Sequence, residues 1–186
     1  MHRIQFTLKE GFGPQVPGVG TLFRAWKQYE NVAIGIRALV PEPFLLTSED
    51  STVAWAFQPL DETGALGQPL SIYVNYAPLP GVDPKLVFDA NKAMVESQTA
   101  ENFPVYDSFE ELDRYDNGAG PVYGFWYKEC PKADPDEIHR WHAGVYGNEA
   151  AYTVGCAGAY RLFEAWGPAL EAVIREFKLV PVPHAL

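Results

Sequence analysis

The stretch that decides the fold lies between residues 121 and 158, in three runs: PVYGFWYKE at 121–129, EIHRWHAGVY at 137–146 and AAYTVGCAG at 150–158. Each run is rich in aromatic, β-branched and small apolar residues, a composition that favours strands. Gly147-Asn148 lies between the last two runs and is typical of a tight turn. The pattern therefore predicts three neighbouring antiparallel strands.

The register of these strands predicts which side chains share a face. A hairpin centred on Gly147-Asn148 pairs Trp141 with Val154, and a connection centred on 131–136 pairs Trp126 with Trp141. Because strand side chains alternate, one register settles both faces. One face is apolar and is expected to pack on a C-terminal helix; it comprises Trp126, Trp141, Ala143, Val145, Tyr152, Val154 and Cys156, with Lys128 and His139 toward one end.

The opposite face carries rings with polar tips, together with Arg and His, and these residue types dominate interface hot spots. We therefore treat this face as the candidate binding surface for a protein partner; it comprises Tyr123, Phe125, Tyr127, Arg140, His142 and Tyr146, with Thr153. The sequence leaves open whether the face is exposed or is covered by residues 1–30 or another loop. If it is exposed, Tyr127→Ala or Tyr146→Ala should abolish partner binding while leaving the melting temperature nearly unchanged.

Further strands are predicted from alternation and turn signals along the rest of the chain. We expect strands over residues 3–8, Asn31–Val40, 52–58 and 70–76, of which the last two form a hairpin, and two short charged strands between Phe103 and Tyr115 that close at Asn117-Gly118. Residues 11–20 are predicted to form a Gly/Pro loop, and 21–30 is ambiguous between helix and strand.

Two helices are predicted. The first begins at Asp83-Pro84, which suits a helix start, and extends to about Gln98 with an apolar stripe of Leu86, Val87, Ala90, Met94 and Ser97. The second is expected to be broken at Gly167-Pro168, so that its main segment begins near Pro168 and ends near Lys178. Its stripe comprises Phe163, Leu170, Val173, Ile174 and Phe177.

The composition predicts one globular domain, because 47% of the residues are hydrophobic and 20% are charged. We expect an extension at 1–30, a single α+β domain at 31–180 and a tail at 181–186. The fold class that follows is α+β, an antiparallel β-sheet covered on one face by two helices. The chain is expected to be a monomer or a homodimer.

Charge and hydropathy exclude several partners. A net charge of −10 with no run of basic residues argues against nucleic acid and anionic membranes, which both require clustered Lys and Arg. No apolar stretch is long enough for membrane insertion, and residues 1–10 lack the apolar core of a signal peptide. We therefore expect a cytoplasmic protein. Cys130 and Cys156, placed two strands apart, are expected to be free thiols.

Motifs that could support catalysis or metal binding are weak. His139 and His142 could share a metal ion on a helix, but on a strand they face opposite sides. The acidic residues Asp107, Glu110, Glu111, Asp113 and Asp116 lack the spacing of a calcium loop and suit a solvated edge strand. In the predicted register Cys156 lies opposite His139, yet on the apolar face, where an inert thiol is expected. We therefore predict no cofactor, no metal and no catalytic residue.

The order of predicted elements resembles the PsbP-like/DcrB-like α+β fold over residues 31–180. The resemblance rests on the strand at Asn31–Ile36 leading into Pro41–Phe44, on Leu70–Tyr76 followed by a helix, and on the closing segment from Phe163 to Phe177. It implies a non-enzymatic adaptor or a chaperone-like role. Residues 1–30 and the lack of a lipoprotein or transit leader depart from it, and no family residue can be carried over.

Two other functions remain open. The chain could carry a small apolar ligand in a cavity between sheet and helices, lined by Trp55, Phe57, Trp126 and Trp141. Alternatively, it could be a metal-dependent enzyme that uses His139 or His142. A protein-binding module is the function that the aromatic face favours.

Overall fold

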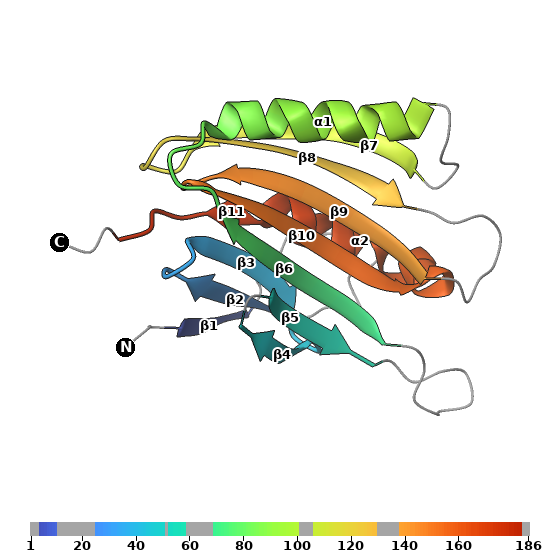
Figure 1. Ribbon diagram of the computed structural model, residues 1–186. Coiled ribbons are helices and arrows are strands. Elements are labelled where there is room, and N and C mark those ends of the chain that lie inside the picture. The colour runs from blue at the N-terminus through green and yellow to red at the C-terminus, as the bar shows by residue number, and fades with distance from the viewer. Residues whose placement is uncertain are drawn as a thin grey trace.

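The computed structural model of the protein describes residues 4–10, 25–50, 52–58, 69–100, 106–129 and 138–183. These residues form two antiparallel sheets and two helices (Figure 1). In chain order the elements are β1 (Ile4–Glu10), β2 (Ala25–Asn31), β3 (Ile36–Pro41), β4 (Leu45–Glu49), β5 (Thr52–Phe57), β6 (Leu70–Pro78), α1 (Pro84–Ala100), β7 (Tyr106–Asp116), β8 (Pro121–Glu129), β9 (Ile138–Gly147), β10 (Ala150–Ala159), α2 (Tyr160–Glu176) and β11 (Lys178–Leu179).

The strand order in the larger sheet is β4-β5-β6-β10-β9-β8-β7, and in the smaller sheet it is β1-β2-β3-β11. All neighbouring strands pair antiparallel. The predicted α+β class is confirmed. The proposed boundary at residue 30 stays a prediction, although β1 pairs with β2 and β2 pairs with β3.

The three-strand meander is confirmed as β8, β9 and β10, but its register differs from the prediction by two residues. Trp141 pairs with Cys156 rather than Val154, and Trp126 pairs with Ala143 rather than Trp141. The turn lies one residue later than expected, at Asn148 and Glu149, which both have a φ of 53°. Positive φ at both central residues is what a tight two-residue hairpin turn requires.

A shift by an even number of residues leaves every side chain on its predicted face, because the side-chain period of a strand is two. The apolar face therefore remains as predicted, with Trp126, Trp141 and Cys156 in one buried cluster. The expected pairing of Cys156 with His139 is wrong, since His139 pairs with Gly158.

The hairpin predicted from residues 52–58 and 70–76 is confirmed as β5 and β6, with Val53 opposite Val74. The strand predicted at 3–8 is confirmed as β1, and the ambiguous segment 21–30 contains the start of β2. The Gly/Pro loop expected at 11–20 lies outside the described residues. Strand β4, which follows Pro43, was not expected from the sequence.

The single long strand expected over Asn31–Val40 is wrong, because the chain turns between β2 and β3. The Asn31 side-chain oxygen accepts a hydrogen bond from the Ala33 amide at 3.1 Å, a local bond that competes with strand pairing. Gly35 then adopts a φ of +69°, which glycine reaches without steric cost. Similarly, the two strands expected between Phe103 and Tyr115 are one strand, β7, with two irregularities in its pairing to β8.

Helix α1 begins as predicted, with the Asp83 carboxylate accepting the Lys85 amide at 2.8 Å. The expected apolar stripe is only partly correct. Phe88 and Val95 are buried against the sheet, whereas Leu86 is 65% exposed and Met94 50% exposed. Of the predicted stripe, Val87 packs against this core, whereas Leu86, Ala90, Met94 and Ser97 are exposed.

Helix α2 does not break at Gly167-Pro168 but continues through both residues from Tyr160 to Glu176. Pro168 faces solvent, while Gly167 lies against the core: a Cβ atom at Gly167 would be 3.1 Å from the Trp141 ring. Packing of the apolar face on the sheet outweighs the cost of an interior proline. All five residues of the predicted stripe are confirmed as buried, and Trp166 belongs to it as well.

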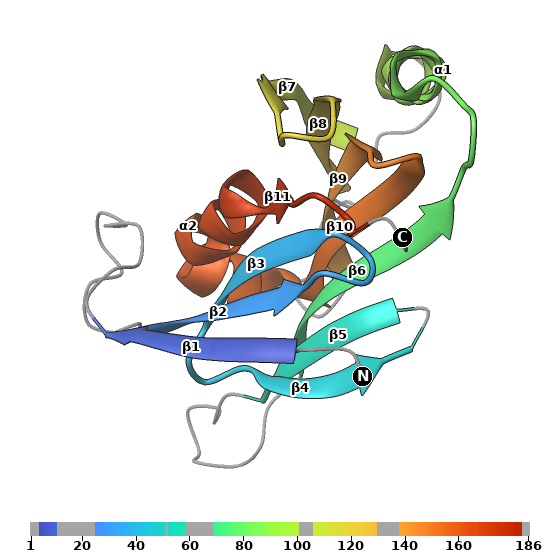
Figure 2. The same ribbon diagram turned by 90° about the vertical axis from the view of Figure 1, so that its left-hand side faces the viewer.

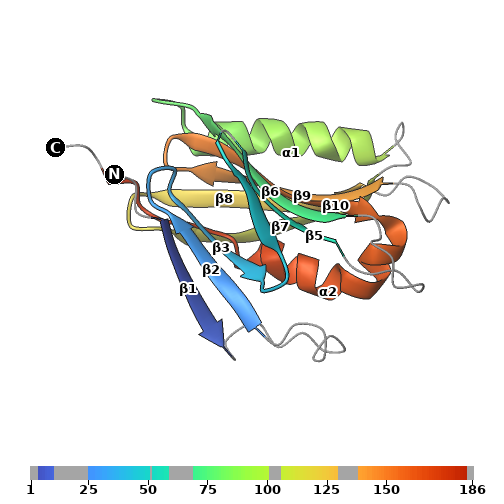
Figure 3. The ribbon, with the colours of Figure 1, turned by 90° about the horizontal axis from the view of Figure 1, so that it is seen from below.

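The two helices cover opposite faces of the larger sheet. In Figure 3 α1 lies on one side of it, and α2 lies on the other side together with β1 and β2. The main core, between the two sheets and α2, contains Tyr29, Trp55 and Trp141. The expectation that both helices cover one face is therefore wrong, because α1 packs on the aromatic face through Phe88 and Val95.

Strand β7 is the edge of the larger sheet among the described strands, as predicted for the acidic segment. Its consecutive acids bind both helices: Glu110 accepts two hydrogen bonds from Arg175 of α2 at 3.0 and 2.7 Å, and Glu111 pairs with Lys92 of α1. The Trp126 indole also donates to Glu110 at 3.1 Å. Because consecutive side chains of a strand point to opposite faces, Glu110 and Glu111 connect this edge strand to the helices on both faces of the sheet.

Replacing Glu110 tests its pairing with Arg175. Glu110→Gln should lower the free energy of unfolding at neutral pH by less than about 1 kcal/mol, because the pair is largely solvent-exposed. Hydrogen bonding from Arg175 holds the pKa of Glu110 below its ordinary value of 4.5. The stabilisation is thus complete above that value and lost as pH falls through the lowered pKa. Thermal unfolding along a pH series should show the two proteins converging in acid; a constant difference would contradict the pairing.

Candidate functional site

The aromatic face of the larger sheet is divided by α1 into a covered part and an open part. In the covered part Phe125 is 2% exposed and Tyr146 5% exposed. Both pack on Phe88 of α1, with ring centroids 6.0 and 6.2 Å away. Burial raises the pKa of the Tyr146 hydroxyl to about 12.

Phe125 and Tyr146 therefore belong to a second hydrophobic core beneath α1. Of the two alternatives that the sequence left open, these two rings are covered rather than exposed, so Tyr146→Ala is expected to lower stability. The covering element is helix α1, whose distance from β8 and β9 in the sequence gave no sign of this contact. Tyr123 lies at the border: its ring is 5.7 Å from the Phe88 ring and 4.8 Å from the Arg114 guanidinium.

The open part is organised around a row of three rings that crosses four strands. Tyr127 of β8 stacks on His142 of β9, with centroids 5.2 Å apart and an interplanar angle of 13°. Tyr73 of β6 meets His142 from the other side at 6.2 Å, edge to face. The Tyr73 hydroxyl lies 3.4 Å from His142 Nδ1. We call Tyr127, His142 and Tyr73 the ring row.

The ring row is continuous because β10 contributes a glycine at the crossing point. Gly155 pairs with His142 on one side and with Tyr73 on the other. A Cβ atom at Gly155 would lie 2.2 Å from Cζ of Tyr73, so only glycine lets this ring lie flat across β10. Without a side chain there, two rings that are separated by a whole strand come into contact.

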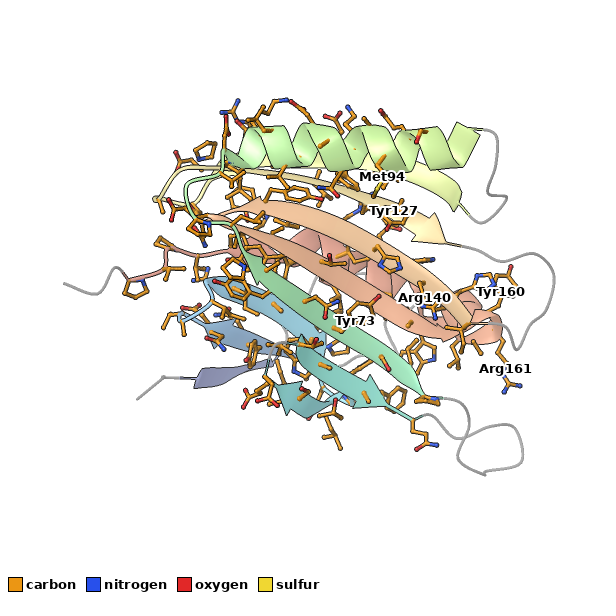
Figure 4. The ribbon with its side chains drawn as sticks, in the orientation of Figure 1. Tyr73, Met94, Tyr127, Arg140, Tyr160 and Arg161 are labelled. Atoms are coloured by element: carbon orange, nitrogen blue, oxygen red, sulfur yellow. The ribbon has the colours of Figure 1, made fainter. Side chains whose placement is uncertain are left out.

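The side chains around the ring row are mostly small or polar. Arg140 is exposed on β9, one row away from His142, and Figure 4 shows Met94 on the side of α1 that borders this region. Other outward side chains of β5, β6 and β10 include Thr52, Ala54, Ala56, Ser71, Asn75, Thr153 and Ala157. We define the open face as the ring row with Arg140, Met94 and these residues.

Tyr73 was missed as a candidate because the sequence provided no register between β6 and the meander. Its outward position followed from the alternation of Leu70, Ile72 and Val74. Only the pairing of β6 with β10, two segments far apart in the chain, brings it beside His142.

His139 and His142 lie on opposite faces of β9, as a strand requires. His139 is 4% exposed and packs on Tyr160 at 4.6 Å, inside the α2 side of the sheet. A metal site shared by the two histidines is therefore contradicted by the geometry. Within residues 25–50, 52–58, 69–97 and the other described side chains, no group of three His, Cys, Asp or Glu residues could hold a metal ion.

The Cys156 thiol is fully buried, and burial raises its pKa. This is the opposite of the activation that a nucleophilic thiolate requires. Cys130 lies outside the described residues. Among the described residues, the four rings expected to line one cavity do not gather around a common space: Phe57 packs on Trp166 at 4.9 Å and Trp126 on Trp141 at 5.9 Å, whereas Trp55 borders a groove between the two sheets.

Comparison with solved structures concerns the arrangement of these elements. The chain is similar to the cyanobacterial PsbP (CyanoP) from Synechocystis sp. PCC 6803, with a TM-score of 0.45 and 14% identity over 90% of this chain and 99% of that chain. It is also similar to the Ran-binding protein Mog1p from Saccharomyces cerevisiae, with a TM-score of 0.41 and 12% identity over 96% of this chain and 97% of that chain. Both proteins share the PsbP-like fold that the order of elements in the sequence resembles.

At these identities the likeness concerns the fold alone, and the function proposed below does not depend on it. No family model matches the chain, and no curated protein matches its sequence. Neither described helix is long and apolar enough to cross a membrane.

Proposed function

We propose that this protein is a non-catalytic protein-binding module that contacts its partner through the open face. The observation that carries the proposal is the ring row, in which two tyrosines and a histidine, each half-buried, are held together beside the part of the sheet that α1 covers among the described residues. Such residues contribute large contact area with few rotatable bonds.

Preorganisation strengthens this interpretation. Tyr127 is fixed by stacking on His142, and Tyr73 is fixed by lying over Gly155. Because these rings already contact one another, their side chains would lose little additional entropy when a partner binds. Arg140 and the half-exposed Met94 add two residue types that interface cores favour.

The composition of the open face favours a folded protein surface over a small ligand. Small side chains such as Ala54, Ala56 and Ala157 share this face with the ring row. Ligands of low molecular weight are bound in concave pockets. An adaptor or chaperone-like role is compatible with such a surface.

Substitution of the ring row should separate binding from stability. Tyr73→Ala and Tyr127→Ala are each expected to weaken partner binding by more than about tenfold. Partners recovered with the wild-type protein would be purified, and their affinities for each variant measured by titration calorimetry. Leu45→Ala, which removes a 66% exposed side chain from a distant strand, is the matched control and should bind normally.

Equal affinities for the wild type, both tyrosine variants and the control would show that the open face is not the contact surface. Circular dichroism of each variant checks that the sheet is retained. Loss of binding in the Leu45 control alone would place the partner elsewhere on the molecule.

A further inference from the structure

We propose that a groove between the two sheets binds a small apolar carboxylate, either an aromatic acid or a medium-chain fatty acid. The groove has a volume of about 350 Å³ and is lined by Lys27, Tyr29, Val40, Phe44, Leu45, Leu46 and Trp55. It is distinct from the open face.

The groove arises because β2 and β3 of the smaller sheet lie across β4 and β5 of the larger one, as Figure 2 shows. Alternation places Lys27 and Tyr29 on the same face of β2, where Lys27 pairs with Val40. This face points toward the larger sheet, since the Tyr29 ring meets the Trp55 ring edge-on at 5.0 Å.

Aromatic rings of the core lie beneath the groove. Tyr29, Phe44 and Trp55 are 0%, 1% and 2% exposed, so their positions are set by the core. The surface that a ligand would touch comes mainly from Leu45, which is 66% exposed, and from the half-buried Lys27 and Leu46. A dry cavity of about 150 Å³ can already hold benzene, and ligand pockets begin near about 300 Å³. The space therefore suits a single ring system or a short alkyl chain.

Lys27 is the reason to expect a carboxylate on the ligand. It is the one charged residue in the lining, and its ammonium group donates to the Glu42 carbonyl oxygen at 2.8 Å, which holds it beside the groove. An ammonium group has three donors, so a carboxylate can be bound as well. The neighbouring Glu49 carboxylate accepts the Tyr29 hydroxyl at 3.2 Å and does not line the groove.

Lys27 is half-buried and its hydrogen bond to Glu42 is exposed, so its charge lies at the edge of the groove. A neutral apolar ligand would gain nothing from this ammonium group, whereas an apolar carboxylate would place its chain against Leu45 and Leu46 and its charge on Lys27. A cation beside an apolar groove therefore favours anionic over neutral ligands.

Octanoate and its neutral counterpart 1-octanol form a matched pair of probes. Wild-type protein should bind both, with octanoate bound about fivefold more tightly. Binding would be measured by titration calorimetry, and the shift of the Trp55 indole N–H signal in ¹H–¹⁵N spectra would locate the ligand. The same spectra report whether each variant is folded.

Two variants test the two parts of the site. Lys27→Met should remove the preference for octanoate, a loss of about fivefold, while leaving 1-octanol binding unchanged. Leu45→Trp, at an exposed position, should fill the mouth and weaken both probes by more than about tenfold. A folded wild type that binds neither probe, equal effects of Lys27→Met on both, or unchanged binding in Leu45→Trp would each overturn the proposal.

Discussion

Phe125→Ala should lower the free energy of unfolding by about 3 to 5 kcal/mol, the cost of deleting a fully buried ring from a core. Phe125 is 2% exposed and lies between the sheet and Phe88 of α1. The deletion leaves a cavity that the helix can close only in part, because α1 is also held by Val95. Urea unfolding monitored by circular dichroism gives the difference directly.

Tyr127→Ala is the matched control, since Tyr127 is two residues further along the same face of β8 but lies on the open side. It should cost less than half as much. Similar small losses in both variants would mean that α1 does not cover this part of the sheet. A double-mutant cycle between Phe125→Ala and Phe88→Ala should also show coupling, because the two rings are in contact.

Gly35→Ala should be the most harmful change at a turn, with a loss of about 3 to 5 kcal/mol. Gly35 has a φ of +69°, and a Cβ atom there would lie 2.5 Å from the Asn148 side-chain nitrogen and 2.8 Å from the Val180 carbonyl oxygen. The Asn148 amide donates to that carbonyl at 2.8 Å and so joins the β9–β10 turn to the segment after β11. The substitution would strain the backbone and would also displace the Asn148–Val180 hydrogen bond.

Gly81→Ala isolates the backbone part of the effect. Gly81 has a φ of +71°, and no described atom lies within 4 Å of where its Cβ would be. This variant should lose only about 1 to 2 kcal/mol. Thermal and urea unfolding of both variants provide the comparison, and equal losses would mean that the contacts of Gly35 contribute nothing beyond its backbone conformation.

The candidate site shows what the alternation of side chains along a strand can and cannot predict. All six residues chosen from the sequence lie on one face of the sheet, although the predicted register was displaced by two residues. An even displacement preserves the face, so the choice tolerated that error. The same alternation could not distinguish the buried Phe125 from the half-buried Tyr127, because both are aromatic residues at equivalent positions of one alternating pattern.

The errors in the helix predictions have a different cause. Leu86 and Met94 fit helical spacing as well as Phe88 and Val95 do, and only the docked sheet selects which stripe is buried. At α2, the local rule that Gly-Pro ends a helix was overridden by packing, since Gly167 lets the helix lie on Trp141.

The amino-acid sequence by itself determined the strands of the meander, the two sides of each strand and the start of α1. These properties depend on residues next to one another in the chain. Only the tertiary structure decided which element covers each side, that Tyr73 joins His142 across Gly155, and that Lys27 faces an apolar groove. Burial against any complementary surface lowers the free energy of an apolar or aromatic surface. The residue pattern of that surface therefore does not identify which distant segment will cover it.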